Sequence, residues 1–310
     1  MTDLAADKLP TPASPVAAKA ETPLRRFISA FCENKLALFG LALVIVVAIA
    51  AILAPWLAPQ NPYDIAKLDI FDSKMPPGSA SSDGSMTYWL GTDGQARDML
   101  SAMMYGLRVS LLVGAVSVVA ALAIGTMVGL VAAFFGGRVD AFLMRCVDIQ
   151  LSFPAILVAL ILLAVLGQGV DKVLYALIAV QWAYFARAAR AAALVEREKE
   201  YIEAARCLAL PQRRILWRHL LPNCLPPLIV IATVEVAHAI ALEATLSFLG
   251  LGVPVTEPSL GKLIANGFEF LMAGKYWIAL FPGLALAIAL IGINLVGDHL
   301  RDILNPRNAR

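Results

Sequence analysis

Glu235 and His238 lie three positions apart in a long apolar segment, and Glu243 follows further along it. Helix bundles that hold two metal ions use Glu-x-x-His pairs of this kind, but they need two such pairs and two further carboxylates. The chain carries one such pair together with Glu243, so no metal site is predicted. Ionisable groups at membrane depth instead face a protein interior or an aqueous path. Glu235 and His238 are therefore candidates for lining a polar path through a membrane.

The other reactive residue types form no catalytic pattern. Gly261 and Lys262 resemble part of a phosphate-binding loop, which requires GxxxxGK followed by Ser or Thr. Thr256 stands where the first glycine is required, and Leu263 follows the lysine. The three histidines, at 219, 238 and 299, have no nucleophile at a spacing typical of a catalytic pair. We expect neither enzymatic activity nor a cofactor bound by this chain.

The elements that position these residues are predicted to lie in a bilayer. Apolar residues make up 60% of the 310 residues and charged residues 15%, whereas soluble domains average about 25% charged residues. The net charge of +2 is too small and too dispersed for nucleic-acid binding. Crossing the hydrocarbon takes about 20 apolar residues. Six segments are candidates: 36–58, 109–135, 146–167, 173–189, 225–250 and 277–296. The sequence thus predicts an all-α integral membrane protein with six transmembrane helices.

The segment 173–189 is the weakest of the six, because it is short and is interrupted by Gln181 and Arg187. A buried or re-entrant helix is the alternative interpretation. With six spans, 18 of the 25 Lys and Arg residues fall on one side, and cytoplasmic segments are rich in these residues. Both termini are therefore expected in the cytoplasm. The four cysteines, at 32, 146, 207 and 224, fall on the same reducing side, so no disulfide is expected.

This topology divides the chain into five parts. They are a cytoplasmic tail (1–35) predicted to be partly disordered, a first transmembrane helix (36–58), an acidic outer segment (59–108), a five-helix core (109–298) and a cytoplasmic C-terminal tail (299–310). The outer segment has too few apolar residues to hold a core of its own. The core includes a long basic connection on the cytoplasmic side, residues 190–222.

Within that connection the sequence predicts an amphipathic helix over 198–208. Four residues at helical spacing form one apolar stripe, with Glu203 and Arg206 outside it: Tyr201, Ala204, Ala205 and Leu208. Pro211 ends this helix because proline lacks the amide donor. A second short helix is predicted to run to Leu221, and Pro222 marks the return into the membrane. The stripe suits the groove of a partner protein, although a helix resting on anionic lipid would explain the arginines equally well.

The same connection resembles the EAA motif, through which permease subunits of bacterial ABC importers engage their ATPases. In that motif EAA is followed by a glycine and then by Leu-Pro. The matching residues are Glu203, Ala204, Ala205, Leu221 and Pro222. Ala209 stands at the glycine position. Because alanine resists the positive φ that glycine permits, we expect Ala209 to adopt a conventional turn helped by Pro211.

Three further stretches resemble the second-subunit type of the dipeptide/oligopeptide/nickel permease family. They are Trp89-Leu90-Gly91-Thr92-Asp93 followed by Arg97-Asp98, the stretch from Glu243 to Gly252, and Asn294-Leu295-Val296-Gly297-Asp298 with an Asn-Pro-Arg ending at 305–307. Ala96 replaces a usual glycine of the first stretch. The resemblance implies structural roles for Asp93, Arg97, Glu243 and Asp298, with Glu243 holding the outer end of its span through hydrogen bonds.

This resemblance implies a six-helix type I importer permease of the MetI-like fold in the bacterial plasma membrane. Its partners would be a homologous permease, one or two cytoplasmic ATPases that bind ATP and Mg²⁺, and a periplasmic or lipid-anchored binding protein. The cargo would be di- or oligopeptides, with nickel chelates, opines or another small solute as alternatives. A proton-coupled secondary transporter using Glu235, His238 and Glu243 as a relay is the rival class, but it usually shows inverted repeats, which this sequence lacks.

Overall fold

The computed structural model describes residues 23–64 and 68–304. The disorder predicted for the start of the N-terminal tail and the Asn-Pro-Arg ending lie outside these residues. The first half of the described chain contains α1 (Pro23–Glu33), α2 (Lys35–Ile52), α3 (Ala54–Leu57), the 3₁₀ turn η2 (Ile70–Asp72), strands β1 (Ser79–Ala80) and β2 (Thr87–Tyr88), α4 (Met99–Phe135) and α5 (Gly137–Ser152). The second half contains α6 (Ala155–Leu166), α7 (Val170–Glu196), α8 (Glu200–Cys207), α9 (Gln212–Arg214), the π-helix η3 (Ile215–Leu220), α10 (Leu221–Phe248), α11 (Leu260–Phe268), the 3₁₀ turn η4 (Leu271–Ala273) and α12 (Trp277–Leu304).

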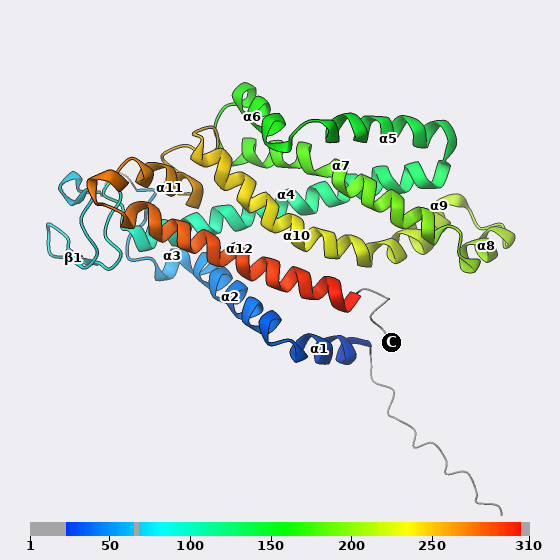
Figure 1. Ribbon diagram of the computed structural model, residues 1–310, viewed down its shortest axis with the longest axis horizontal. Helices are drawn as coiled ribbons and strands as arrows, with labels where there is room; N and C mark the ends of the chain where they lie inside the picture. Colours follow the sequence, from blue (N-terminus) through cyan, green and yellow to red (C-terminus); the bar gives the residue numbers. More distant parts are fainter. Residues whose placement is uncertain (1–22, 65–67, 305–310) are drawn as a thin grey trace, which may run out of the picture.

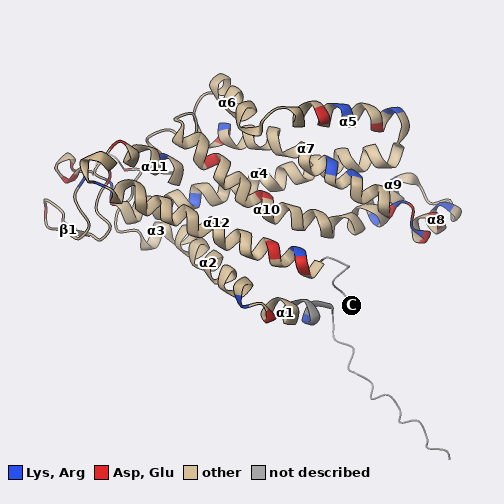
Figure 2. Ribbon diagram, in the orientation of Figure 1, with Lys and Arg blue, Asp and Glu red and all other residues tan. Residues whose placement is uncertain are grey.

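The long helices run along the long axis of the molecule (Figure 1). The antiparallel strands β1 and β2 gather with α11 at one end, here called the β1 end, and α8 lies at the other, the α8 end (Figure 1). Charged residues concentrate at the two ends and along α5 and α7, whereas α2 is nearly free of them (Figure 2). This distribution is typical of helices that cross a bilayer, because charges are costly in the hydrocarbon.

Four helices of the described chain are long and apolar enough to cross a membrane: Lys35–Ile52, Met99–Phe135, Gln212–Phe248 and Trp277–Leu304. The third predicted span, 146–167, is wrong as a single straight helix. It lies within the pair α5 and α6, which meet at a bend of 87°. Phe153 adopts extended backbone at this break, because the ring of Pro154 disfavours helix in the residue before it. Counting this pair as one broken span gives five.

Helix α7 is the remaining predicted span, and it packs in parallel with α4. Val113 of α4 shares a buried cluster with Val173 of α7, and twenty residues later in both helices Ala133 shares another cluster with Ala193. Two parallel helices require the intervening α5–α6 pair to return along the bundle. Apolarity alone does not mark α7 as a span. The count of six therefore stays a prediction, which the parallel packing supports.

Glycines allow the close approach of α4 to its neighbours. A Cβ atom on Gly125 would lie 2.3 Å from the carbonyl oxygen of Trp182, and one on Gly129 would lie 2.4 Å from that of Ala186. Both glycines face α7, four residues apart on one side of α4. Small residues at this spacing let membrane helices pack at short range. Larger side chains at either position would force α4 and α7 apart.

The outer segment is held by polar contacts. The carboxylate of Asp72, 2% exposed, accepts hydrogen bonds from the backbone amide of Ser82 (2.9 Å) and the hydroxyl of Tyr88 (2.8 Å). Burial alone would raise the pKa of Asp72, but these bonds and those of the Ser82 and Ser81 hydroxyls outweigh burial and lower it. The last part of the predicted outer segment (59–108) is helical. Helix α4 begins at Met99 instead of residue 109, because Asp98 caps it by accepting from the amide of Ser101 (2.8 Å).

Candidate functional site

Helix α8 presents one face to the molecule and the other to solvent. Ile202 and Ala205, 1% and 4% exposed, pack against Ile215 of η3. The predicted stripe is therefore wrong in one member, because Ala205 points inward with Ile202. The residues left exposed are Glu200, Tyr201, Glu203, Ala204, Arg206, Cys207 and Leu208. We call this exposed set, on α8 and its C-cap, the docking face.

Contacts with the end of α7 fix the direction of α8. The guanidinium of Arg197 donates to the carbonyl of Ala133 at the end of α4 (2.6 Å). The hydroxyl of Tyr201 donates to Glu196 (2.7 Å), which also pairs with Lys199 (2.6 Å). Burial, together with this bond to a carboxylate, raises the pKa of Tyr201. The docking face is thus attached to the ends of α4 and α7.

Ala209 ends α8 in the left-handed conformation, with φ +53°. The expectation of a conventional turn is wrong. The amide of Leu210 donates to the carbonyl of Ala205 (3.2 Å), and that of Ala209 donates to Arg206 (2.9 Å), which together form the Schellman motif that usually employs glycine. These bonds compensate for the strain that an alanine Cβ suffers at positive φ. Ala96, the other alanine at a family glycine position, also has positive φ, +63°.

Replacing Ala209 or Ala96 with glycine is expected to stabilise the protein. Each change relieves the strain of the left-handed backbone, but glycine also makes the unfolded chain more flexible. The net increase in the free energy of unfolding should be up to about 1 kcal/mol. Thermal unfolding of the purified chain would measure it. Ala191 is exposed in the helical backbone of α7, so Ala191→Gly should instead destabilise by about 1 kcal/mol. Destabilisation by all three changes would contradict the strain argument.

Leu221 and Pro222 lie at the start of α10 and not in a separate loop. The chain from Gln212 to Phe248 forms one continuous helix, so the short helix predicted to run to Leu221 is not separate from the span that follows it. The continuous helix begins with α9 and continues as the π-helix η3, after which the amide of Leu221 donates to the carbonyl of Leu216 five residues earlier. A π-helix at this place is explained by Pro222, whose ring crowds the carbonyl four residues before it.

Glu235 and His238 lie on one side of α10, near the middle of its length. The Glu235 Oε1 atom is 3.6 Å from His238 Nδ1, and the side chains are 15% and 68% exposed. Among the described residues no group of three or more His, Cys, Asp or Glu is placed to hold a metal ion. Sequence reasoning missed two polar neighbours, Gln181 and Tyr184 of α7, which line the same cavity as Glu235 and His238. In the sequence, Gln181 indicates only an interruption of an apolar segment.

Glu243 is fully buried and ties α10 to α4. Its carboxyl group accepts hydrogen bonds from the hydroxyls of Ser110 on α4 and Ser247 on α10, each at 2.8 Å. Ser247 in turn accepts from the amide of Val253 beyond the end of α10 (3.3 Å). This geometry suits the structural role that the sequence motif implies. It separates Glu243 from Glu235 and His238, eight and five residues earlier on the helix.

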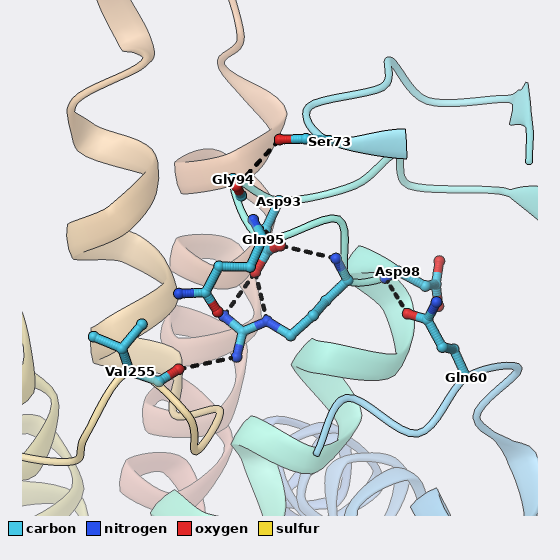
Figure 3. Close-up of polar contacts among 8 residues, drawn as sticks. Gln60, Ser73, Asp93, Gly94, Gln95, Asp98 and Val255 are labelled. Carbon is cyan, nitrogen blue, oxygen red and sulfur yellow. Dashed lines mark hydrogen bonds and ion pairs between the residues drawn. The ribbon is translucent and has the colours of Figure 1, made fainter. Parts of the chain in front are cut away.

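Asp93 and Arg97 form a buried ion pair in the turn before α4. The Arg97 Nε and Nη2 atoms each lie 2.7 Å from Asp93 Oδ2, and the side chains are 2% and 1% exposed. The contacts of this turn, which also reach the carbonyl of Val255 in the loop after α10, are drawn in Figure 3. Gln60 accepts a hydrogen bond from the amide of Asp98 (2.7 Å). The turn therefore joins three separate segments at the β1 end.

Asp298 is exposed on α12. In the C-terminal stretch that resembles the permease family, the neighbours of Asp298 make the contacts. Gly297 lies against Thr233 of α10. His299 accepts through Nδ1 from the side-chain Nδ2 of Asn34 (3.2 Å) and donates through Nε2 to the carbonyl of Ala30 (3.3 Å). These contacts attach α1 to α12, and sequence reasoning did not identify them.

A helical membrane bundle with an exposed helix at one end and polar side chains on α7 and α10 is compatible with a transport permease subunit, and comparison with known proteins establishes this class. The chain belongs to the family described as binding-protein-dependent transport system inner membrane component, which it matches over residues 125–310. Residues 22–77 match the N-terminal TM domain of oligopeptide transport permease C. The family and the apolar helices establish a multi-pass membrane protein.

Similar proteins include two curated permeases. The dipeptide transport system permease protein DppC of Escherichia coli (strain K12) is 41% identical over 286 residues, covering 92% of this chain and 94% of its own length. The di/tripeptide transport system permease protein DppC of Pseudomonas aeruginosa (strain UCBPP-PA14) is 36% identical and covers 96% of both chains. A chain of the MetNI methionine ABC transporter, solved in inward-facing conformations, matches the fold with a TM-score of 0.54 at 21% identity, covering 66% of this chain and 97% of that one.

Proposed function

We propose that this chain is one of two homologous permease subunits of an ATP-driven importer, with one or two ATPases docked on α8. The docking face carries this proposal, because it is exposed while the opposite side of α8 is buried on Ile215. A helix that rested on lipid would need a broad apolar face. The exposed apolar residues of α8 and its C-cap are interleaved with Glu203 and Arg206, which suits a protein groove better. ATP and Mg²⁺ belong to the ATPases in this proposal.

The route of coupling follows from the continuity of the helix. A displacement of α8 acts on Ile215 of η3, which continues without a break into α10. Glu235 lies twenty residues further on, about 30 Å along the axis. Closure of the ATPases would therefore move the polar residues of α10 and switch the two permeases between inward-facing and outward-facing states. A binding protein would deliver cargo at the β1 end, which this proposal places outside the cytoplasm.

Peptides are the cargo we propose, since the similar permeases named above carry dipeptide or di/tripeptide in their names. Nickel chelates and other small solutes remain the alternative cargo. The rival class, a secondary transporter, would need a continuous relay from Glu235 to Glu243, but the carboxyl group of Glu243 is occupied by two serine hydroxyls.

Reconstitution tests the function. The complete importer in proteoliposomes should hydrolyse ATP faster with binding protein and dipeptide present and should accumulate the peptide. The chain alone should do neither. Uptake of peptide driven by the chain alone would overturn the proposal, and uptake of nickel chelates in place of peptides would change the cargo.

Thiol labelling tests the orientation, in which both termini are cytoplasmic. A membrane-impermeant maleimide added to intact spheroplasts should leave the native cysteines unlabelled and should react with an introduced Ser85→Cys, which lies in an exposed turn at the β1 end. In inside-out vesicles the exposed Cys207 should react, whereas the buried Cys224 should not. Labelling of Cys207 from outside would reverse the topology.

A further inference from the structure

A cavity of about 240 Å³ lies between α6, α7 and α10 and is lined by Ala155, Val180, Gln181, Tyr184, Glu235, His238 and Leu242. A water molecule occupies about 30 Å³, so the cavity has room for a small polar group with several atoms. Its polar lining comes from α7 and α10, and its apolar lining includes residues of all three helices. Glu235 also borders a second cavity of about 460 Å³ towards α12, which Arg301 lines.

The amide of Gln181 gives the first sign of a ligand. The residue is 3% exposed, yet its Oε1 atom has no hydrogen-bond partner among the residues that the structure describes. A buried polar atom without a partner costs stability, and most such atoms in native proteins are paired. Because the side chain of Gln181 lines the cavity, a hydrogen-bond donor bound there would give this oxygen a partner.

The charge of Glu235 gives the second sign. Its recorded ion-pair partner is His238 at 3.6 Å, a group that is charged only when it is protonated. With neutral imidazole the carboxylate of Glu235 has no ion-pair partner among the described residues, and a partly buried charge is costly unless a cation or water reaches it. The polar lining thus offers a carboxylate, a carbonyl oxygen and the hydroxyl of Tyr184 as acceptors.

The surface around this cavity does not suit lipid. His238 and Tyr184 are 68% and 45% exposed, and the nearby pair of Arg187 and Asp148 is 57% and 55% exposed with its atoms 2.7 Å apart. Exposed ionisable groups along membrane helices face a water-filled path or another protein. This side of α7 and α10 is therefore the side that a companion permease and the transported solute would meet.

We propose that this cavity is a subsite for the protonated amino terminus of a peptide on its way through the importer. This inference rests on the proposed function and names the part of the cargo that the chain would contact. An ammonium group has three N–H donors and one positive charge. Glu235 supplies the opposite charge, and Gln181 and Tyr184 supply the two neutral acceptors. Glu235 and His238 alone provide too few ligands for a tight metal site.

The test measures binding without the binding protein, which would otherwise select the cargo first. The assembled permease and ATPase complex in nanodiscs is titrated with L-alanyl-L-alanine or its N-acetyl derivative, and saturation-transfer NMR records binding. Only the free dipeptide should bind. Glu235→Gln and Gln181→Met should each weaken its binding about tenfold, the value expected for losing a hydrogen bond to a charged group.

Two controls separate binding from structure. Gln181→Met removes an unpaired polar atom at nearly constant volume, so it should not lower the thermal stability of the complex. If the amide of Gln181 had a structural role instead, its loss would lower that stability. Asp148→Asn removes a carboxylate that Arg187 already satisfies and should leave dipeptide binding unchanged. Binding of both peptides equally, binding of Ni²⁺ in place of the dipeptide, or loss of stability in Gln181→Met would overturn the subsite.

Uptake by the wild-type importer, measured in parallel with its binding protein, separates the two proposals. Peptide uptake without amine-dependent binding in the cavity would refute the subsite and keep the proposed function. Amine-dependent binding that both variants weaken, without peptide uptake, would keep the subsite and refute the proposed cargo.

Discussion

Replacing Glu203 with lysine is expected to abolish ligand-stimulated ATP hydrolysis by the assembled importer while leaving this chain folded and inserted. The side chain is exposed on the docking face, so no buried contact of the chain is lost. Reversing its charge against a complementary ATPase surface would cost several kcal/mol of docking energy. The rate of hydrolysis with binding protein and dipeptide should fall at least about tenfold.

Glu198→Lys is the matched control for this change. Glu198 is 71% exposed, precedes α8 and pairs with the adjacent Arg197 (2.9 Å), so its replacement makes the same change in charge outside the docking face. Stimulated hydrolysis should persist in this variant. Normal hydrolysis and transport by Glu203→Lys would instead identify α8 as a helix that rests on lipid.

Replacing Asp93 with asparagine should destabilise the β1 end by about 3–5 kcal/mol, because it leaves the buried guanidinium of Arg97 without its counter-charge. Asparagine preserves the shape of the turn, since its Oδ1 atom can still accept from the amides of Gln95 and Arg97, as Asp93 does at 2.8 and 2.9 Å. Thermal unfolding of the purified chain and the rate of proteolysis within residues 59–98 would measure the loss of stability.

A second change on the same chain tests the cause. Adding Arg97→Met to Asp93→Asn removes the unpaired charge and should recover much of the stability, because removing both partners of a buried pair costs less than removing one. Asp171→Asn, at the solvent-exposed pair with Lys172, should have no measurable effect. If Asp93→Asn lowers the stability no more than this control does, burial of the Asp93–Arg97 pair contributes little to the stability of the β1 end.

Helix positions were predictable from the sequence where apolar runs are long and uniform. α2, α4, α10 and α12 stand out by hydropathy, because their neighbours in the bundle and lipid are both apolar. α7 does not stand out, because polar residues lower its hydropathy. Gln181 lines a cavity, and Arg187 pairs with Asp148. The bend between α5 and α6 was also missed, because Pro154 has little effect on hydropathy.

The candidate site was predictable in part. The motif identified α8 and its exposed residues. Which residues of the predicted stripe are buried depends on Ile215, which lies outside α8 and packs on Ala205. The conformation of Ala209 was missed because residue preference favoured a conventional turn, whereas two hydrogen bonds of the Schellman motif outweigh that preference. Gln181 and Tyr184 joined the site only once α7 was placed beside α10.

The continuous helix from Gln212 to Phe248 also sets the size of the stroke that an importer would need. A rod of this kind converts a rotation at its base into a displacement that grows with distance. Over the roughly 30 Å between Ile215 and Glu235, a tilt of about 10° moves the far residue by about 5 Å, close to one turn of α-helix. A small rotation at the ATPases would therefore suffice to carry Glu235 past one row of side chains on a facing helix.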